Sequence, residues 1–389
     1  MGRELINRAG VSLGASALSF RRAVTWVWMR GILPVFLISV WLLSGQTAAP
    51  TFQALSRQAE VARDAKQLDK SLALYKRALK LKPDWDEGLW NLGSLAYDLD
   101  QYSECAPAFR RLAALKPDSA PAWTMAGLCE YRLRKYDAAL DSLSHAEGLK
   151  FQGPPELARS ARLHLALVLT KSGSFERAIT VLTELTLLHK KAPDSAVAAG
   201  IAGLRQPWLP FEVPEASRDL VFQLGDAMAS AMEKDYKEAT QKFEAALQQY
   251  PQEPNLHFRF GAFLNIQDSA RGIEEIKKAV ELAPDHVPAL VGLTVMYLKR
   301  EEIDLAVECG ERAVKAGPED FSTHIALGRA LLAKENPARA AAELQVAVRL
   351  APASPEARFS LASAYTRLGR KTESARELAE FKRLQNLDK

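Results

Sequence analysis

The feature that most constrains this chain is the return of one helix-ending motif at a fixed interval. Leu-Lys-Pro-Asp occurs at residues 81–84 and again at 115–118, so that Pro83 and Pro117 lie thirty-four residues apart. Pro cannot continue a helix, because its ring clashes with the preceding turn and it has no N–H. From residue 52 onward, apolar residues follow the helical period of about 3.6 residues and are interrupted by Pro, Gly and Asp. The sequence therefore predicts helical hairpins that recur along the chain.

Aligning the repeats in one common numbering of positions tests this prediction. If Pro83 is position 32 of a repeat, nine repeats follow, the last one truncated; they begin at Phe52, Asp86, Ala120, Arg159, Leu220, Pro254, Val287, Phe321 and Pro355. Position 8 is always small: Ala59, Gly93, Gly127, Ala166, Ala227, Gly261, Thr294, Gly328 and Ala362. Position 20 is also small: Ser71, Cys105, Ala139, Ala178, Ala239, Gly272, Ala306, Ala340 and Ser374. Two helices can therefore cross closely in every repeat, and stacked repeats bury the apolar stripe that one hairpin leaves open.

The repeats resemble the tetratricopeptide repeat (TPR) family. The residues that carry the resemblance are Leu92, Gly93, Phe109 and Pro117; Trp123, Gly127, Tyr136, Ala139 and Ala146; Tyr236, Ala239, Phe243, Ala246 and Pro251; and Leu327, Gly328, Ala340, Ala347 and Pro352. The resemblance implies an all-α fold, a right-handed α-solenoid of stacked antiparallel helix pairs. We expect the Asp or Ser that follows the repeated Pro to cap the next helix.

The repeats predict two blocks, residues 52–190 with about four repeats and residues 219–389 with about five, the last of which acts as a cap. Residues 191–218 fit no repeat and are predicted to be an irregular Pro-rich linker, with a short helix at 195–204 and an extended stretch at 206–214. Trp208, Leu209 and Phe211 are apolar enough to need cover. Either neighbouring repeats bury them, or they act as a lid or a partner contact.

The N-terminus has the pattern of a targeting segment. An apolar run at residues 31–43 follows Arg21, Arg22 and Arg30 and leads into small and polar residues, which is typical of a secretory signal. Residues 23–43 together are also long enough for a membrane anchor. We expect residues 1–48 to be a signal peptide or an N-terminal anchor, and the protein to be exported, periplasmic or secreted, or membrane-anchored; a cytoplasmic protein with an unusual N-terminus is the remaining alternative.

Charge and composition exclude several classes of function. The chain has a net charge of +4, but the basic excess lies in residues 1–48, and the remainder is neutral. We therefore expect no nucleic-acid binding. The cysteines Cys105, Cys129 and Cys309 are too scattered for a zinc site; they are either small apolar helix residues or include a Cys105–Cys129 disulfide. Six isolated histidines and the lack of catalytic or phosphate-binding motifs predict a protein that is not an enzyme and has no cofactor and no metal.

The family resemblance implies that the first helix of each repeat lines a concave groove, through positions 2, 5, 9, 12 and 13. On this register the candidate peptide-binding residues are Trp90, Tyr97, Leu128, Tyr131, Arg132, Leu163, Met228, Met232, Phe258, Lys299 and Arg329. Aromatic and apolar side chains beside cations suit a peptide with apolar anchors and an acidic group. The alternative is that many of these residues pack between helices, since one position of register error turns a side chain by about 100°.

Two functions follow. The first is a non-catalytic interaction scaffold that holds peptides or partner proteins of unknown identity in its groove. Membrane contact is then limited to residues 23–43, if they are retained. The alternative is a structural or assembly component of an envelope complex that acts through the ends or convex face of the array.

Overall fold

The computed structural model describes residues 51–188, 192–265 and 269–387, and these residues contain nineteen α-helices, two short 3-10 helices and no strand. They fall into two compact bodies, an N-terminal body of residues 51–172 and a C-terminal body of residues 173–387. The division lies inside the fourth predicted repeat. The predicted N-terminal segment, residues 1–48, lies outside the described residues. The prediction of an all-α fold is confirmed.

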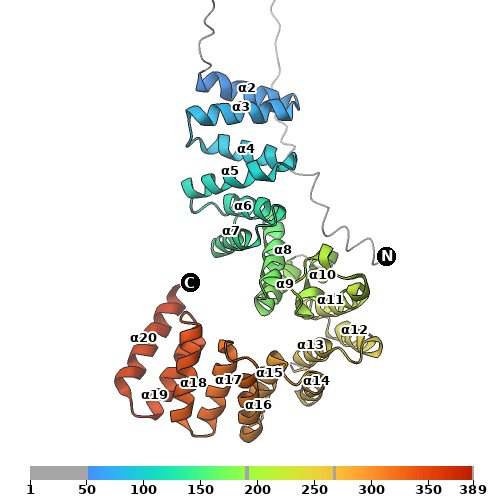
Figure 1. Cartoon of the computed structure of the whole chain (residues 1–389), viewed down its shortest axis with the longest axis vertical. Helices are drawn as coiled ribbons and strands as arrows, with labels where there is room; N and C mark the ends of the chain where they lie inside the picture. Colours follow the sequence, from blue (N-terminus) through green and yellow to red (C-terminus); the bar gives the residue numbers. More distant parts are fainter. Residues whose placement is uncertain (1–50, 189–191, 266–268, 388–389) are drawn as a thin grey trace, which may run out of the picture. The chain divides into compact units, whose positions relative to one another are not determined.

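The N-terminal body consists of three successive helix pairs and a further helix (Figure 1). These are α2 (Phe52–Asp64) and α3 (Leu68–Leu81), α4 (Asp86–Asp98) and α5 (Tyr102–Leu115), α6 (Ala120–Arg132) and α7 (Tyr136–Gly148), and α8 (Pro155–Lys171). Each pair packs on itself, and α8 packs against α6 and α7. Three of these helices begin at the first residue of a predicted repeat.

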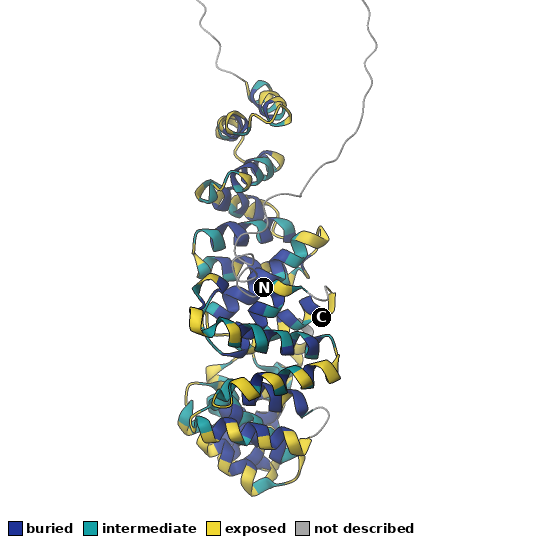
Figure 2. Ribbon diagram, turned by 90° about the vertical axis from the view of Figure 1, so that its right-hand side faces the viewer, coloured by how far each residue is buried: buried dark blue, intermediate teal, exposed yellow. Residues whose placement is uncertain are grey.

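The C-terminal body begins with α9 (Phe175–Leu188), α10 (Pro193–Gly203), the 3-10 helices η1 (Pro210–Glu212) and η2 (Glu215–Ser217), and the pair α11 (Arg218–Met232) and α12 (Tyr236–Gln249). The pairs α13 (Pro254–Leu264) and α14 (Ser269–Leu282), α15 (Val287–Lys299) and α16 (Ile303–Ala316), α17 (Phe321–Ala333) and α18 (Pro337–Leu350), and α19 (Pro355–Arg367) and α20 (Lys371–Leu387) follow. Buried residues line the faces where these helices meet (Figure 2).

The small residues at position 8 are explained by a large residue on the second helix. A Cβ on Gly93 would lie 2.6 Å from the Phe109 ring, and a Cβ on Gly328 would lie 2.5 Å from Leu344 Cγ. Because the large side chain fills the space of the missing one, the two helices of the pair approach closely. The predicted close crossing is confirmed in these repeats.

The repeated prolines have a second role that the sequence did not reveal. In four repeats, a side chain at position 4 donates a hydrogen bond to the carbonyl of the preceding Pro: Trp123 to Pro117, His257 to Pro251, His324 to Pro318 and Arg358 to Pro352. The predicted helix caps are confirmed at Ser119, Asp320 and Ser354, but at α4 the N-cap position is Trp85, not Asp84, and its side chain makes no capping hydrogen bond.

The segment predicted as a linker is largely incorporated into the C-terminal body. It contains α10, close to the helix expected at 195–204, and α10 packs on α9 and α11. Leu209 and Val213 are buried, whereas Phe211 is 50% exposed. At the crossing of α10 and α11, a Cβ on Gly225 would lie 2.1 Å from the Ala196 carbonyl oxygen. The two backbones are therefore in direct contact there.

A buried arginine joins the same segment to the repeats that follow. Arg259 on α13 is 8% exposed and donates to the Gly203 carbonyl and, through two nitrogens, to both carboxylate oxygens of Glu176 at 3.0 and 2.9 Å. Arg205 donates to the same carboxylate at 2.8 Å. Burial raises the pKa of Glu176, but the hydrogen bonds and charges of the two arginines outweigh burial and lower it. This cluster fixes α9, the end of α10 and α13 together.

Cys105 on α5 and Cys129 on α6 form a disulfide, with their Cα atoms 6.0 Å apart. Both residues are fully buried, and the bond joins the second helix of one repeat to the first helix of the next. Of the two alternatives for these cysteines, the structure therefore has the disulfide. Cys309 is free and buried.

Candidate functional site: a tyrosine and cation surface

In the N-terminal body, two tyrosines and a cation meet in the same way in two successive repeats. Tyr97 lies edge-on to Tyr102 with ring centroids 5.6 Å apart, and Arg132 from the following repeat lies over the Tyr102 ring at 5.8 Å. One repeat later, Tyr131 lies 5.9 Å from Tyr136, and Lys171 lies over the Tyr136 ring at 5.8 Å. We call Tyr97, Tyr102, Tyr131, Arg132, Tyr136 and Lys171 the tyrosine–cation surface.

The repeat register explains why these side chains meet. Each first tyrosine is at position 12, in the last turn of the first helix, and each second tyrosine is at position 17, where the second helix begins. Between them, the residue at position 15, Asp100 or Arg134, has a positive φ of 55° or 58°, which reverses the chain. The cation is at position 13 of the next repeat, and therefore reaches the ring of the preceding one. All six side chains are partly exposed.

A cavity of about 470 Å³ adjoins the second of these arrangements. Tyr136 and Lys171 line it together with Arg134, Lys135 and Asp137, and Val168 and Leu140 supply part of its apolar wall. Its size and mixed lining are compatible with one or two side chains of a ligand.

Carboxylates continue the surface toward the N-terminus of the body. The Tyr102 hydroxyl donates to Asp100, and burial together with this bond raises the pKa of Tyr102 to about 12. Tyr102 is therefore neutral at physiological pH. Burial also raises the pKa of Asp98, which is at position 13 of its repeat. Position 13 is thus acidic and exposed at Asp64 and Asp98 in the first two repeats.

The other predicted groove residues of the N-terminal body lie mostly in its interior. Trp90 is half-buried and lies edge-on to Phe109, with centroids 5.3 Å apart. Leu128 and Leu163 are 4% and 5% exposed, so their side chains pack between helices. Tyr131 contacts the buried ring of His164 at 4.8 Å, which anchors the surface on α8.

In the C-terminal body, the predicted groove residues do not come together. Met228 and Met232 are buried, Met232 against the Thr186 hydroxyl and Met228 beside Gly203, so they pack among α9, α10 and α11 instead of facing a groove. They are buried because α10 covers the face of α11 that the repeat register predicted to line the groove. Phe258 is 7% exposed and packs against His286.

The two predicted cations of this body are exposed. Lys299 is the last residue of α15, and Arg329 on α17 forms an ion pair with Glu356 at 2.8 Å.

Tyr102 and Tyr136 are absent from the predicted binding set, whereas Lys171 lies at position 13, one of the positions that the register assigned to the groove. Tyr102 and Tyr136 begin second helices, and the prediction considered only the first helices. The signal was nevertheless present, because Tyr recurs at positions 12 and 17 of the second and third repeats and a cation at position 13 of the third and fourth.

Residues 51–188, 192–265 and 269–387 hold no group of three or more His, Cys, Asp or Glu placed to bind a metal ion. Within the same ranges, no helix has the length and apolarity needed to cross a bilayer. The apolar segment at 23–43 lies outside them.

Comparisons with known proteins agree with the repeat register. A family model described as tetratricopeptide repeat matches residues 91–154 and 325–384. Both regions consist of the helix pairs described above. These two regions are tetratricopeptide repeats, as the register predicted.

Solved structures of MamA proteins are similar to part of this chain. A structure named "MamA 41-end from Desulfovibrio magneticus RS-1" is 22% identical over 41% of this chain and 91% of its own, with a TM-score of 0.38. "MamA RS-1 ArsTM double mutant" is also 22% identical, over 41% and 90%, with a TM-score of 0.38, and "Crystal structure of MamA" is 17% identical over 41% and 94%, with the same TM-score. Scores this low support no conclusion about function. No curated protein matches the sequence.

Proposed function

We propose that this TPR protein is a non-catalytic scaffold that binds a segment of a partner protein on the tyrosine–cation surface. The observation that carries the proposal is the repetition of two tyrosines and a cation in consecutive repeats, at ring distances of 5.6 and 5.9 Å. Tyrosines provide large contact areas with few rotatable bonds, and they are enriched at binding hot spots. Because the arrangement recurs at the interval of the repeat, it suits a partner segment that binds in an extended conformation and contacts successive repeats.

The charges at position 13 specify the chemistry of the partner. Asp64 and Asp98 supply carboxylates in the first two repeats, and Arg132 and Lys171 supply cations in the next two. A bound segment would therefore be acidic where it passes Arg132 and Lys171 and basic where it passes the two aspartates. Such complementarity favours one partner and one direction of binding.

We further propose that the protein acts outside the cytoplasm, either exported or held at a membrane by its N-terminal segment. Support comes from the signal-like pattern at residues 21–43 and from the disulfide between Cys105 and Cys129. Disulfides persist mainly in oxidising compartments. Membrane-associated partners are the ones to examine if residues 23–43 are retained.

A second function, assembly through the outer helices, is favoured by a different observation. Leu81, Leu115 and Leu350 all lie at position 30 of their repeats, at the ends of second helices, and all are exposed, by 56%, 45% and 36%. Apolar residues that recur on one register position can form a shared contact. This alternative predicts that the position-30 leucines, and not the tyrosine–cation surface, contact other proteins.

The experiment that tests the first proposal is a selection from a random peptide library on the full chain. We expect the selected peptides to contain Asp or Glu, and to bind Arg132→Glu about tenfold or more weakly, because the substitution replaces attraction by repulsion. Arg329→Glu is the matched control, since it reverses the charge of an exposed arginine in the other body. Peptides that bind Arg132→Glu and the wild type equally well would contradict the proposal.

A further inference from the structure

At position 4 of three repeats in the C-terminal body, a side chain forms hydrogen bonds to two oxygen atoms of different segments. His257 contacts a Glu275 carboxylate oxygen with Nδ1 at 2.7 Å and the Pro251 carbonyl with Nε2 at 3.0 Å. His324 contacts Glu343 at 2.7 Å and the Pro318 carbonyl at 2.9 Å in the same way. Each ring thus links the second helix of its own repeat to the turn that ends the preceding repeat.

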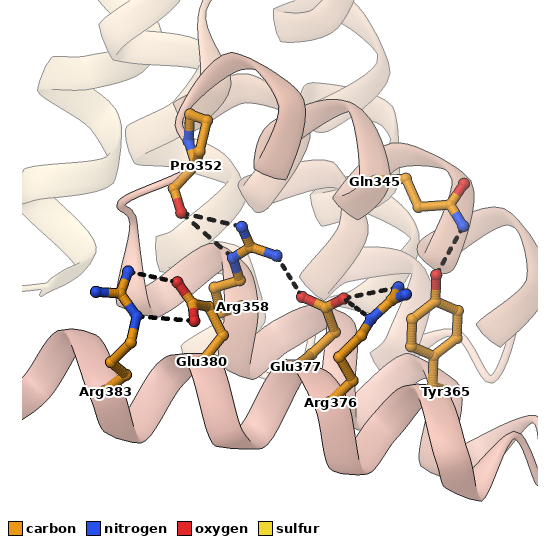
Figure 3. A network of polar contacts seen from close by, with 8 residues as sticks. All are labelled: Gln345, Pro352, Arg358, Tyr365, Arg376, Glu377, Glu380 and Arg383. Carbon is orange, nitrogen blue, oxygen red and sulfur yellow. Dashed lines mark hydrogen bonds and ion pairs between the residues drawn. The ribbon is translucent and has the colours of Figure 1, made fainter.

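Arginine occupies this position in the last repeat and makes the same connections. Arg358 donates to the Pro352 carbonyl through Nε and Nη2, at 3.3 and 3.2 Å, and to Glu377 through Nη1 at 2.6 Å (Figure 3). Because a guanidinium has only donors and stays charged, this link is independent of pH in the physiological range.

The two histidines can make both bonds in only one protonation state of the pair. A backbone carbonyl only accepts, and so does an ionised carboxylate. Two hydrogens are therefore needed, one at Nε2 and one between Nδ1 and the glutamate oxygen, whichever of these two atoms holds it. If the pair loses one of these hydrogens, a lone pair of a ring nitrogen faces a lone pair of an oxygen, and that hydrogen bond is lost. His257 and His324 are 6% and 5% exposed, so water does not replace the lost bond readily.

The surroundings of His257 favour the protonated pair. Burial lowers the pKa of His257, but the hydrogen bonds to Glu275 and to the Pro251 carbonyl outweigh it and raise this pKa above its ordinary value. On α14, Lys278 donates to the other oxygen of Glu275 at 2.9 Å and opposes the imidazolium only weakly. The α13 cap, Glu253, accepts from the Asn255 amide.

The charged groups around His324 are similar. Glu343 on α18 faces the ring, and Asp320, which caps α17, accepts from the Ser322 amide and hydroxyl. The turn before α17 supplies the Pro318 carbonyl.

His286 provides an internal contrast. Its Nδ1 accepts from the Ala289 amide and its Nε2 donates to the Asn255 side-chain oxygen, so one hydrogen satisfies both ring nitrogens. Burial, with Arg205 and Arg259 nearby, lowers the pKa of His286 to about 4. This ring is neutral throughout the physiological range, although it lies only one repeat from His257.

We propose that His257 makes the link between its repeat and the preceding one pH-sensitive: the link holds while the His257–Glu275 pair keeps its second proton and loosens when the pH rises, whereas the Arg358 link does not change. The sign follows from the raised pKa of His257. Its contribution to stability is complete below the ordinary histidine pKa of about 6.5 and is lost as the pH rises through the higher value of the folded protein.

Hydrogen exchange of the full chain, at pH 5.5 and pH 8.5 and corrected for intrinsic rates, tests the proposal. We expect protection of α13–α14 to fall about tenfold at the higher pH, and protection of α19–α20 to stay constant. His257→Arg should abolish the change, and Arg358→His should transfer it to α19–α20. An equal change in both pairs, or a change that survives His257→Arg, would overturn the proposal.

Nitrogen chemical shifts of the histidines in the wild-type chain decide the case even where a variant does not fold. At pH 6, His257 should show hydrogen on both ring nitrogens, or shared between Nδ1 and the carboxylate, and His286 on Nε2 alone. An Nδ1 of His257 that neither carries this hydrogen nor accepts it from Glu275 at that pH would refute the proposed link.

Discussion

The contact between α10 and α11 leads to a prediction that reverses the usual effect of replacing glycine in a helix. Gly225→Ala adds a Cβ that would lie 2.1 Å from the Ala196 carbonyl oxygen and 3.1 Å from the Gly200 nitrogen. Both neighbours are backbone atoms, and an ordinary carbon–oxygen contact needs at least ~3.2 Å, as weak C–H···O contacts show. The two helices must therefore separate by about 1 Å, because no side chain can rotate away.

The magnitude is set by two opposing effects. Alanine gains about 1 kcal/mol over glycine in a helix. Overpacking against fixed neighbours costs about 1–3 kcal/mol, and sometimes more, and the separation also removes contacts of Leu224 and Met228 with Gly203. We expect a net destabilisation of up to about 2 kcal/mol for the C-terminal body, and more where the lost contacts of Leu224 and Met228 add to it.

Gly148→Ala is the matched control, since Gly148 is an exposed helical residue with no atom within 4 Å of the added Cβ. It should be neutral or stabilising by up to about 1 kcal/mol. Urea unfolding with exchange measured peptide by peptide is the appropriate assay, because repeat arrays need not unfold in one step. If Gly225→Ala retains full protection of α10 and α11, the close crossing is wrong, and residues 191–218 behave as the linker that the sequence suggested.

Three further predictions concern a disulfide, an unpaired hydroxyl and an ion pair. The intact chain should contain a Cys105–Cys129 bond detectable in a non-reducing peptide map, and replacing both cysteines with alanine should lower stability by about 2–4 kcal/mol. Tyr75→Phe should be neutral or stabilising by about 1 kcal/mol in chemical unfolding, because the buried Tyr75 hydroxyl has no hydrogen-bond partner within the described residues; a clear loss would indicate a partner. Glu176→Gln should reduce stability at pH 7 but have little effect near pH 2, because the lowered pKa of Glu176 makes its contribution present above the ordinary pKa and lost as the pH falls; equal losses at both pH values would contradict the ion pair with Arg259.

The sequence was sufficient to predict most of the fold because the repeat imposes the same packing problem many times. Small residues at position 8 face large ones on the second helix, as with Gly93 and Phe109, and such a pattern is visible without coordinates. The N-terminal helices α2, α4 and α6 accordingly begin at the residues that the register predicted. The packing of α10 was harder to predict than its position in the sequence, since it depends on glycines that come into contact only in the folded protein.

The candidate site was predicted less completely, for two physical reasons. The register position of a residue does not show whether another helix covers that residue. Met228 and Met232 were therefore predicted to be accessible, although α10 covers them. The prediction also assigned binding to first helices alone. Tyr102 and Tyr136 lie at the start of second helices and join the surface because the preceding turn reverses the chain within three residues.

The central claim, that partners bind the tyrosine–cation surface, is tested most directly by crosslinking in the native cells. A photoreactive amino acid would replace the exposed Asp98 in one variant and the exposed Leu115 in another, each with and without Arg132→Glu. We predict a discrete adduct from position 98 that disappears with Arg132→Glu, and none from position 115. An adduct from position 115 alone, or one at position 98 that is indifferent to Arg132→Glu, would contradict the claim and favour assembly through the outer helices.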